Sequence, residues 1–237
     1  MSDKFYKKKK IIYLKKNKKL YTNNIVKFCV FAGRKSNLNI LHKYVILLLN
    51  EKIIDEYHMF DFTRNDDDKK YLFDCYENLK DKYQQKIFIH NQDNKQNIKN
   101  NKYDWSPFYK TISDKKFYKN SIIIKCDDDI LFIDINGLKN AINQRIKDKK
   151  SFLIHSNCIN NNICCYYQKD KFNSIRNQLD IYPKGGILGP IFENPIYAYI
   201  MQYQFINDCM NKIENIFSYY LKDIYVNTRI SINFILL

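Results

Sequence analysis

The chain has 237 residues, of which 45% are hydrophobic and 27% are charged, and its formal net charge is +15. This length allows one well-buried core, so a single domain is expected. The seven cysteines argue against a zinc clamp and a disulfide framework, because their number is odd and no two are spaced as Cys-x-x-Cys.

The positive charge does not by itself predict a nucleic-acid partner. The chain is rich in Lys, Asn, Ile and Tyr, which have adenine- and thymine-rich codons, so part of its basicity is attributed to base composition. Residues 1–24 hold a run of lysines between Lys4 and Lys19 and predict a flexible basic arm. The longest aliphatic run, Val45 to Leu49, is too short to cross a bilayer, so no membrane span and a cytoplasmic location are expected.

After this arm, strand-like and helix-like segments alternate along the chain. Apolar runs predict buried strands over residues 25–32, 53–60, 86–90 and 121–126. Helical spacing of apolar residues predicts helices over residues 38–49, 69–79 and 136–147. This alternation is typical of an α/β fold in which helices flank a mostly parallel, Rossmann-like sheet.

Three consecutive carboxylates, Asp127, Asp128 and Asp129, directly follow the fourth predicted strand. Adjacent carboxylates repel one another, and a bound cation relieves that repulsion. Because side chains alternate along an extended segment, Asp127 and Asp129 are expected to point the same way and to share one ion. All-oxygen ligation favours Mn²⁺ or Mg²⁺, which leave positions open for phosphate oxygens. The alternative is a solvated acidic turn.

Two further strand exits are expected at the same edge of the sheet, where such sheets bind their ligands. Gly33 and Arg34 follow the first strand, and Arg64 and Asn65 follow the second. Gly33 would let a ligand approach the backbone, and either arginine would meet a pyrophosphate; the alternatives are a turn glycine and surface arginines. No Gly-x-Gly-x-x-Gly or Walker-type motif is present, so phosphates are expected to be held through a metal ion.

The C-terminal third contains a glycine-rich loop in an otherwise glycine-poor chain. Three of the five glycines lie in residues 182–190. This loop is interpreted as a lid over the site, with an ordinary connector as the alternative. His155 precedes the loop and is a further candidate metal ligand, although a lone His after an apolar run is more often packed or hydrogen-bonded.

Taken together, four segments resemble a GT-A glycosyltransferase, and more narrowly the small single-domain nucleotide-sugar transferases of large DNA viruses and of some protists and fungi. They are Phe28 to Arg34, Asp55 to His58, Phe62 to Asn65 and Ile124 to Ile130. The resemblance implies a nucleotide-sugar half at about residues 25–150 and an acceptor-side half at about 151–237. For a viral protein, the location would be the host cytoplasm or the virion.

The resemblance also implies a donor, a metal and roles for particular residues. The donor would be a UDP- or GDP-linked sugar bound with Mn²⁺ or Mg²⁺, and the acceptor a glycan or a protein. Asp127 and Asp129 would ligate the metal, and Glu193 would be the base that deprotonates the acceptor hydroxyl. The donor would contact Phe31, Ala32, Gly33, Arg34, Arg64, Asn65, Asp127 and Asp128.

Two other functions compete with this hypothesis. A metal-dependent nuclease or nucleotidyltransferase would use the same aspartates on phosphodiesters and would grip nucleic acid with the basic arm. The second competing function is that of a binding protein that has kept the fold but has no catalytic activity. It is suggested by the end of the chain at Leu237, because related transferases usually carry further segments, often with a metal-binding His; the chain is therefore expected to be a shortened or impaired member.

Overall fold

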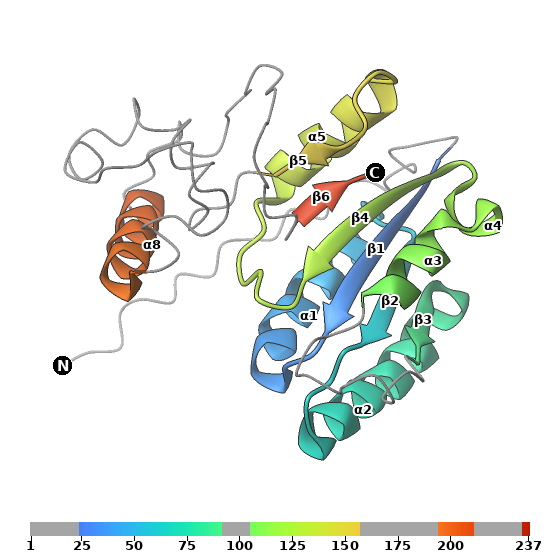
Figure 1. Ribbon diagram of the computed structural model, residues 1–237, viewed down its shortest axis with the longest axis horizontal. Coiled ribbons are helices and arrows are strands. Elements are labelled where there is room, and N and C mark those ends of the chain that lie inside the picture. Colours follow the sequence, from blue (N-terminus) through green and yellow to red (C-terminus); the bar gives the residue numbers. More distant parts are fainter. Residues whose placement is uncertain (1–23, 92–104, 157–193, 211–233) are drawn as a thin grey trace, which may run out of the picture.

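The computed structural model of the chain describes residues 24–91, 105–156, 194–210 and 234–237. In this part of the chain, six strands form one mixed sheet with helices on both of its faces (Figure 1). The basic arm up to residue 23, the glycine-rich loop at 182–190 and Glu193 lie outside the described residues. None of the described helices is long and apolar enough to cross a membrane.

The sheet has the strand order β3-β2-β1-β4-β6-β5. β1, β2, β3 and β4 are parallel to their neighbours, whereas β6 runs antiparallel to both β4 and β5. The prediction of an α/β fold with a mostly parallel sheet is therefore confirmed, and the arrangement is compatible with a Rossmann-like fold. The strands are β1 (Ile25–Ala32), β2 (Glu56–Asp61), β3 (Ile87–His90), β4 (Ser121–Asp127), β5 (Ile154–His155) and β6 (Phe234–Leu236).

The larger core lies between the sheet and three helices. These are α1 (Lys35–Asn50), α2 (Asp66–Tyr83), which continues into the 3-10 turn η1 (Gln84–Lys86), and α5 (Ile135–Lys147). Strand residues at alternating positions, such as Val26, Phe28 and Val30, point into this core. Their burial against Leu41, Val45 and other apolar helix residues supplies the main hydrophobic stabilisation of the domain.

The second face of the sheet carries α3 (Ser106–Ser113) and α4 (Lys115–Tyr118). Phe108 and Ile112 of α3 pack there on Phe31, Phe60 and other residues of the alternate strand positions. β1 is thus buried on both faces, as expected for a central parallel strand. The last described helix, α8 (Pro195–Met210), contacts the segment after β4 through the rings of Phe205 and Phe132, whose centroids are 5.3 Å apart.

Some boundaries differ from the predicted ones for identifiable reasons. α2 begins at Asp66, three residues before the predicted start, because the Asn65 side chain caps it by accepting a hydrogen bond from the Asp68 backbone N–H at 2.8 Å. β2 begins at Glu56, whereas Ile53 and Ile54 are buried in the turn before it. Apolar residues in a buried turn have the same sequence signature as the start of a strand.

A chain of polar side chains crosses the second face beneath α4. Lys27 Nζ lies 3.2 Å from Glu56 Oε2, and this carboxylate accepts a 2.8 Å hydrogen bond from His58 Nε2. Burial lowers the pKa of His58, so its ring is neutral and its Nδ1 is an acceptor. His90 Nε2, 2.9 Å away, is therefore the donor of the bond between the two rings. The contacts fix both tautomers.

Candidate functional site

The candidate site lies at the carboxyl ends of β1 and β4, where the order of the strands reverses. The chain proceeds from β1 to β2 and β3 on one side of this point, and from β4 to β5 on the other. Ligands of open α/β sheets bind in the crevice at such a point. Phe31 of β1 is paired in register with Asp127 of β4, so the first strand exit and the acidic triplet lie at the same edge, as predicted, and are direct neighbours there.

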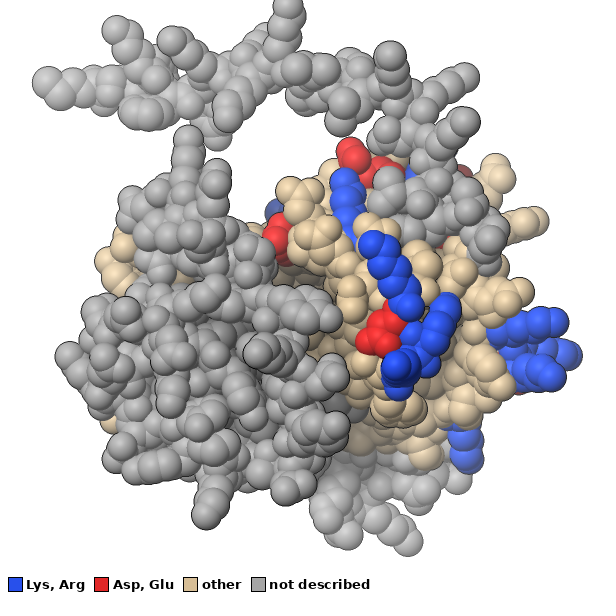
Figure 2. All heavy atoms as spheres, turned by 90° about the horizontal axis from the view of Figure 1, so that it is seen from above, with Lys and Arg blue, Asp and Glu red and all other residues tan. Residues whose placement is uncertain are grey.

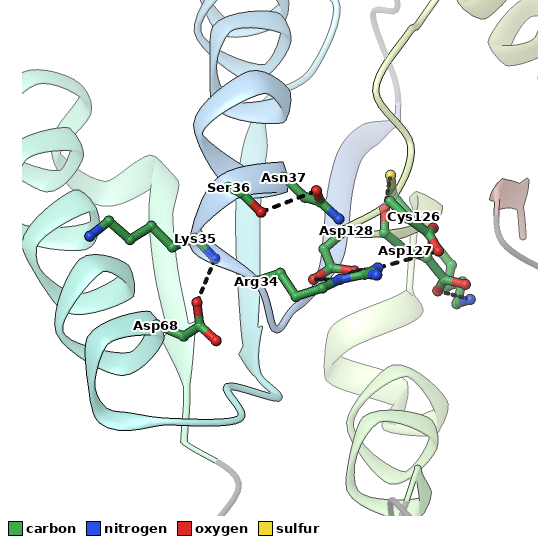
Figure 3. Close-up of polar contacts among 10 residues, drawn as sticks. Arg34, Lys35, Ser36, Asn37, Asp68, Cys126, Asp127 and Asp128 are labelled. Atoms are coloured by element: carbon green, nitrogen blue, oxygen red, sulfur yellow. Dashed lines mark hydrogen bonds and ion pairs between the residues drawn. The ribbon is translucent and has the colours of Figure 1, made fainter.

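The guanidinium of Arg34 binds the second and third aspartates of the triplet, and its contact with the second, Asp128, is visible in Figure 3. Its Nε lies 3.2 and 3.1 Å from the two Asp128 carboxylate oxygens, and a terminal nitrogen also donates to Asp128. The same terminal nitrogen lies 3.3 Å from Asp129 Oδ2. Asp128 is buried, with 6% of its surface exposed. These contacts raise the pKa of Arg34, so the cation is firmly held beside the carboxylates.

A second cation neutralises the first aspartate. Lys125 Nζ forms an ion pair with Asp127 Oδ1 and lies 4.5 Å above the centroid of the Phe31 ring. Lys125 is almost fully buried, and the Asp127 side chain is 24% exposed. Burial raises the pKa of Asp127 to about 6, although the attraction of Lys125 opposes that rise. Two basic side chains of the protein itself therefore offset most of the negative charge of the acidic triplet.

The grouping of the carboxylates differs from the expected one. β4 ends at Asp127, and the chain turns there, with the Ile130 N–H donating to the Asp127 carbonyl at 3.3 Å. The strand alternation therefore does not extend to Asp129. Asp127 points to Lys125, and Asp128 and Asp129 meet at Arg34.

These contacts bear on how a metal ion would fit the site. Among the described residues, no group of three or more His, Cys, Asp and Glu side chains could hold a metal ion. His155 lies in β5, where its Nδ1 contacts the Ser156 carbonyl, and it joins no such group. Asp127 and Asp129 have the oxygen donors that Mn²⁺ and Mg²⁺ prefer. Each of these two carboxylates already contacts a basic side chain of the protein, so a role of both in holding a metal ion stays a prediction.

The remaining predicted residues lie at the same edge with identifiable structural partners. Gly33 and Ala32 are buried at the end of β1. Asn65 caps α2 and also donates through Nδ2 to Asp68 Oδ2 at 2.8 Å, while Asp68 accepts from the Lys35 backbone N–H at 2.8 Å. Arg64 is exposed beside Asn65. A role of any of these residues in binding a ligand stays a prediction.

Sequence reasoning missed two residues that shape the site. Trp105 stacks on Phe31 with a centroid distance of 4.9 Å and lies equally close to Phe62, yet 43% of its surface is exposed. Lys125 provides the counter-charge of Asp127. The signal for Lys125 was a single lysine within an otherwise apolar strand, because a buried lysine needs an anionic partner. For Trp105, the signal was the short aromatic segment before β4.

Comparison with known proteins identifies no relative. No family model matches the chain, and neither a curated protein nor a solved structure matches it. The class that the fold and the site define is therefore an α/β protein with a mostly parallel mixed sheet and a charged cluster at its strand-order reversal.

Proposed function

We propose that the chain is a metal-dependent glycosyltransferase that transfers a sugar from a nucleoside-diphosphate sugar to an acceptor. One observation carries the proposal: the Gly33–Arg34 exit and the acidic triplet meet at the point of the sheet where the strand order reverses. The four sequence segments that resemble GT-A transferases are also consistent with it. UDP- or GDP-linked sugars are the proposed donors, and a glycan or a protein is the acceptor.

In this proposal, different residues at the strand ends bind different parts of the donor. Phe31, Ala32 and Gly33 lie along the base and ribose, and Arg34 or Arg64 meets the diphosphate. Asp127 and Asp129 would hold Mn²⁺ or Mg²⁺. When bound, the cation would offset the negative charge that develops on the departing diphosphate, which is a large part of the barrier to breaking the sugar–phosphate bond. Glu193 is the proposed base.

Calorimetric titration tests the proposal. UDP, GDP and their sugars are titrated into the protein with Mn²⁺ and again with a chelator. Saturable binding that requires Mn²⁺ is expected, together with release of the sugar from its donor. Asp129→Asn keeps the shape of the side chain but removes one anionic ligand, so it should abolish the nucleotide binding that requires Mn²⁺. Asp81→Asn is the matched control, because Asp81 is exposed on α2.

The competing functions give different results in the same experiment. A nuclease or nucleotidyltransferase would bind or cleave oligonucleotides in Mn²⁺ and leave the sugar donors intact. A binding protein without chemistry would bind a donor without releasing its sugar. Absence of any Mn²⁺-dependent nucleotide binding in the parent protein would refute the transferase proposal, and undiminished binding in Asp129→Asn would remove this residue from the site.

A further inference from the structure

A broad hollow lies on the second face of the sheet, beside the acidic site but separate from it. Its volume is about 1040 Å³. Ile123 of β4 and Leu237 after β6 lie on its floor, α3 lines one side, and the end of α5 with the following segment lines another. None of the residue roles proposed above uses this hollow.

The side chains in the described lining of the hollow include three basic groups and no acidic group. The basic groups are those of Lys110, Arg145 and Lys149, and no Asp or Glu is among the described lining residues. Arg145 is held in place because its guanidinium donates to the carbonyls of Asp148 at 3.2 Å and Ser151 at 2.8 Å. Seen from the amino edge of the sheet, the described surface shows more Lys and Arg than Asp and Glu side chains (Figure 2). An anion is therefore the favoured occupant.

Aromatic rings supply the rest of the recognition surface. Trp105, Tyr109, Tyr118 and Phe152 line the hollow and have exposed fractions of 43%, 40%, 48% and 84%. Exposed rings grouped around one concavity usually mark a binding site, since apolar ligand surfaces stack on them with little loss of side-chain entropy. The occupant thus combines an anionic group with an apolar or ring-bearing body.

One end of the hollow adjoins the acidic site. Trp105 lines the hollow and also stacks on Phe31, which is paired in register with Asp127. The other end is at Lys149, beyond the end of α5. A ligand in the hollow would therefore have carboxylates near one end and cations near the other. The basic end attracts the anionic group of such a ligand, and this attraction sets the direction of the ligand in the hollow.

We propose that the hollow binds a phosphomonoester with an apolar or ring-bearing body, and that it orients the phosphate toward Arg145 and Lys149, with Lys110 along the wall. In the proposed transferase, this molecule is a glycan acceptor that carries a phosphomonoester, with its hydroxyl end toward Asp127. Only that assignment as acceptor rests on the proposed function. The binding itself follows from the shape, rings and charge of the hollow.

The fluorescence of Trp105 reports directly on this site, because it is the only tryptophan of the chain. Octyl phosphate, octyl glucoside and inorganic phosphate are titrated separately, each below any micelle concentration. Octyl phosphate should give a saturable change, and the neutral glucoside and inorganic phosphate should bind at least about tenfold more weakly. The double variant Lys110→Glu/Lys149→Glu should weaken octyl phosphate binding by a similar factor, whereas Lys82→Glu on α2 should leave it unchanged.

Phe152→Ala serves as a second variant that does not depend on charge, and its high exposure makes it safe for folding. It should weaken octyl phosphate binding several-fold with an unchanged melting temperature. The inference is overturned if the parent shows no saturable change with octyl phosphate, if the glucoside binds equally well, or if the double variant binds like the parent. Mn²⁺-dependent nucleotide binding is measured in the same variants. If octyl phosphate binds but no nucleotide binds with Mn²⁺, only the transferase proposal is refuted. If nucleotide binds with Mn²⁺ but octyl phosphate does not bind, only the proposed ligand site in the hollow is refuted.

Discussion

Gly33 lies directly against the carboxylate of Asp128. A Cβ atom added at Gly33 would be 3.1 Å from Asp128 Oδ2 and 3.1 Å from the Phe62 carbonyl oxygen. The missing side chain therefore gives Asp128 the space in which it binds Arg34. The glycine that the sequence suggested for ligand approach already has a close neighbour within the protein.

Gly33→Ala should lower the free energy of unfolding by about 1–2 kcal/mol, because the backbone at Phe62 cannot easily yield and the Asp128–Arg34 pair must shift. Urea unfolding measures this change. Asn39→Ala, at an exposed position of α1, is the control and should change stability by less than about 0.5 kcal/mol. An unchanged free energy of unfolding in Gly33→Ala would show that the Asp128 carboxylate has room to move.

Arg34→Gln should cost about 2–4 kcal/mol of unfolding free energy, since it leaves Asp128 buried without its counter-charge. The neighbouring Lys35 forms an exposed pair with Asp67 at 2.9 Å, so Lys35→Gln should cost less than about 1 kcal/mol. Asp128→Asn in the Arg34→Gln background should restore part of the loss. Equal effects of the two single substitutions would contradict a structural role of the buried pair.

Lys125→Met should destabilise the protein more at pH 8 than at pH 5. Lys125 attracts the Asp127 carboxylate, whose pKa is already raised to about 6 by burial. Without the lysine, this pKa rises further above its unfolded value. The carboxyl then destabilises the folded state at high pH, and the penalty is relieved as the pH falls through the folded pKa and a proton binds. Urea unfolding of parent and variant at the two pH values tests this; a penalty that grows toward pH 5 would contradict it.

His42 should make the protein less stable in mild acid. Its ring is buried on the side of the larger core, and Nε2 lies 2.9 Å from the Tyr57 hydroxyl. Among the residues that the structure describes, the buried Nδ1 has no hydrogen-bond partner. Burial lowers its pKa from about 6.5 to about 4. The unfolded chain therefore binds the proton more tightly, and stability falls as the pH decreases from 6.5 toward 4.

His42→Phe should reduce this pH dependence, because the phenyl ring keeps the stack on Tyr71 and cannot bind a proton. It should also lower stability at every pH, since the buried Tyr57 hydroxyl loses its hydrogen bond to His42. Thermal unfolding at pH 7.5, 6 and 5 compares the two proteins. The remaining acid sensitivity is assigned to His58 and His90, whose pKa values are also lowered by burial, that of His90 to about 4. Identical pH profiles of parent and variant would show that His42 does not contribute.

The sequence by itself determined the type of most elements and the edge at which the site lies. Alternating and helical spacings of apolar residues are local signals, and they placed β1 at its observed bounds and α1, α2 and α5 within a few residues. Because parallel strands end at one edge, the positions of Gly33, Arg34 and the triplet after two strands were enough to predict that they lie at the same edge.

Only the tertiary structure decided the partners of the charged residues. Arg34 and Asp128 are 94 positions apart, and they meet because β1 and β4 are adjacent in the sheet, which no local pattern specifies. The antiparallel insertion of β6 between β4 and β5 is likewise set by long-range pairing. Carboxylates in a row reveal a need for positive charge, but whether an arginine, a lysine or a metal ion supplies it depends on which side chains the folded backbone brings within a few ångströms.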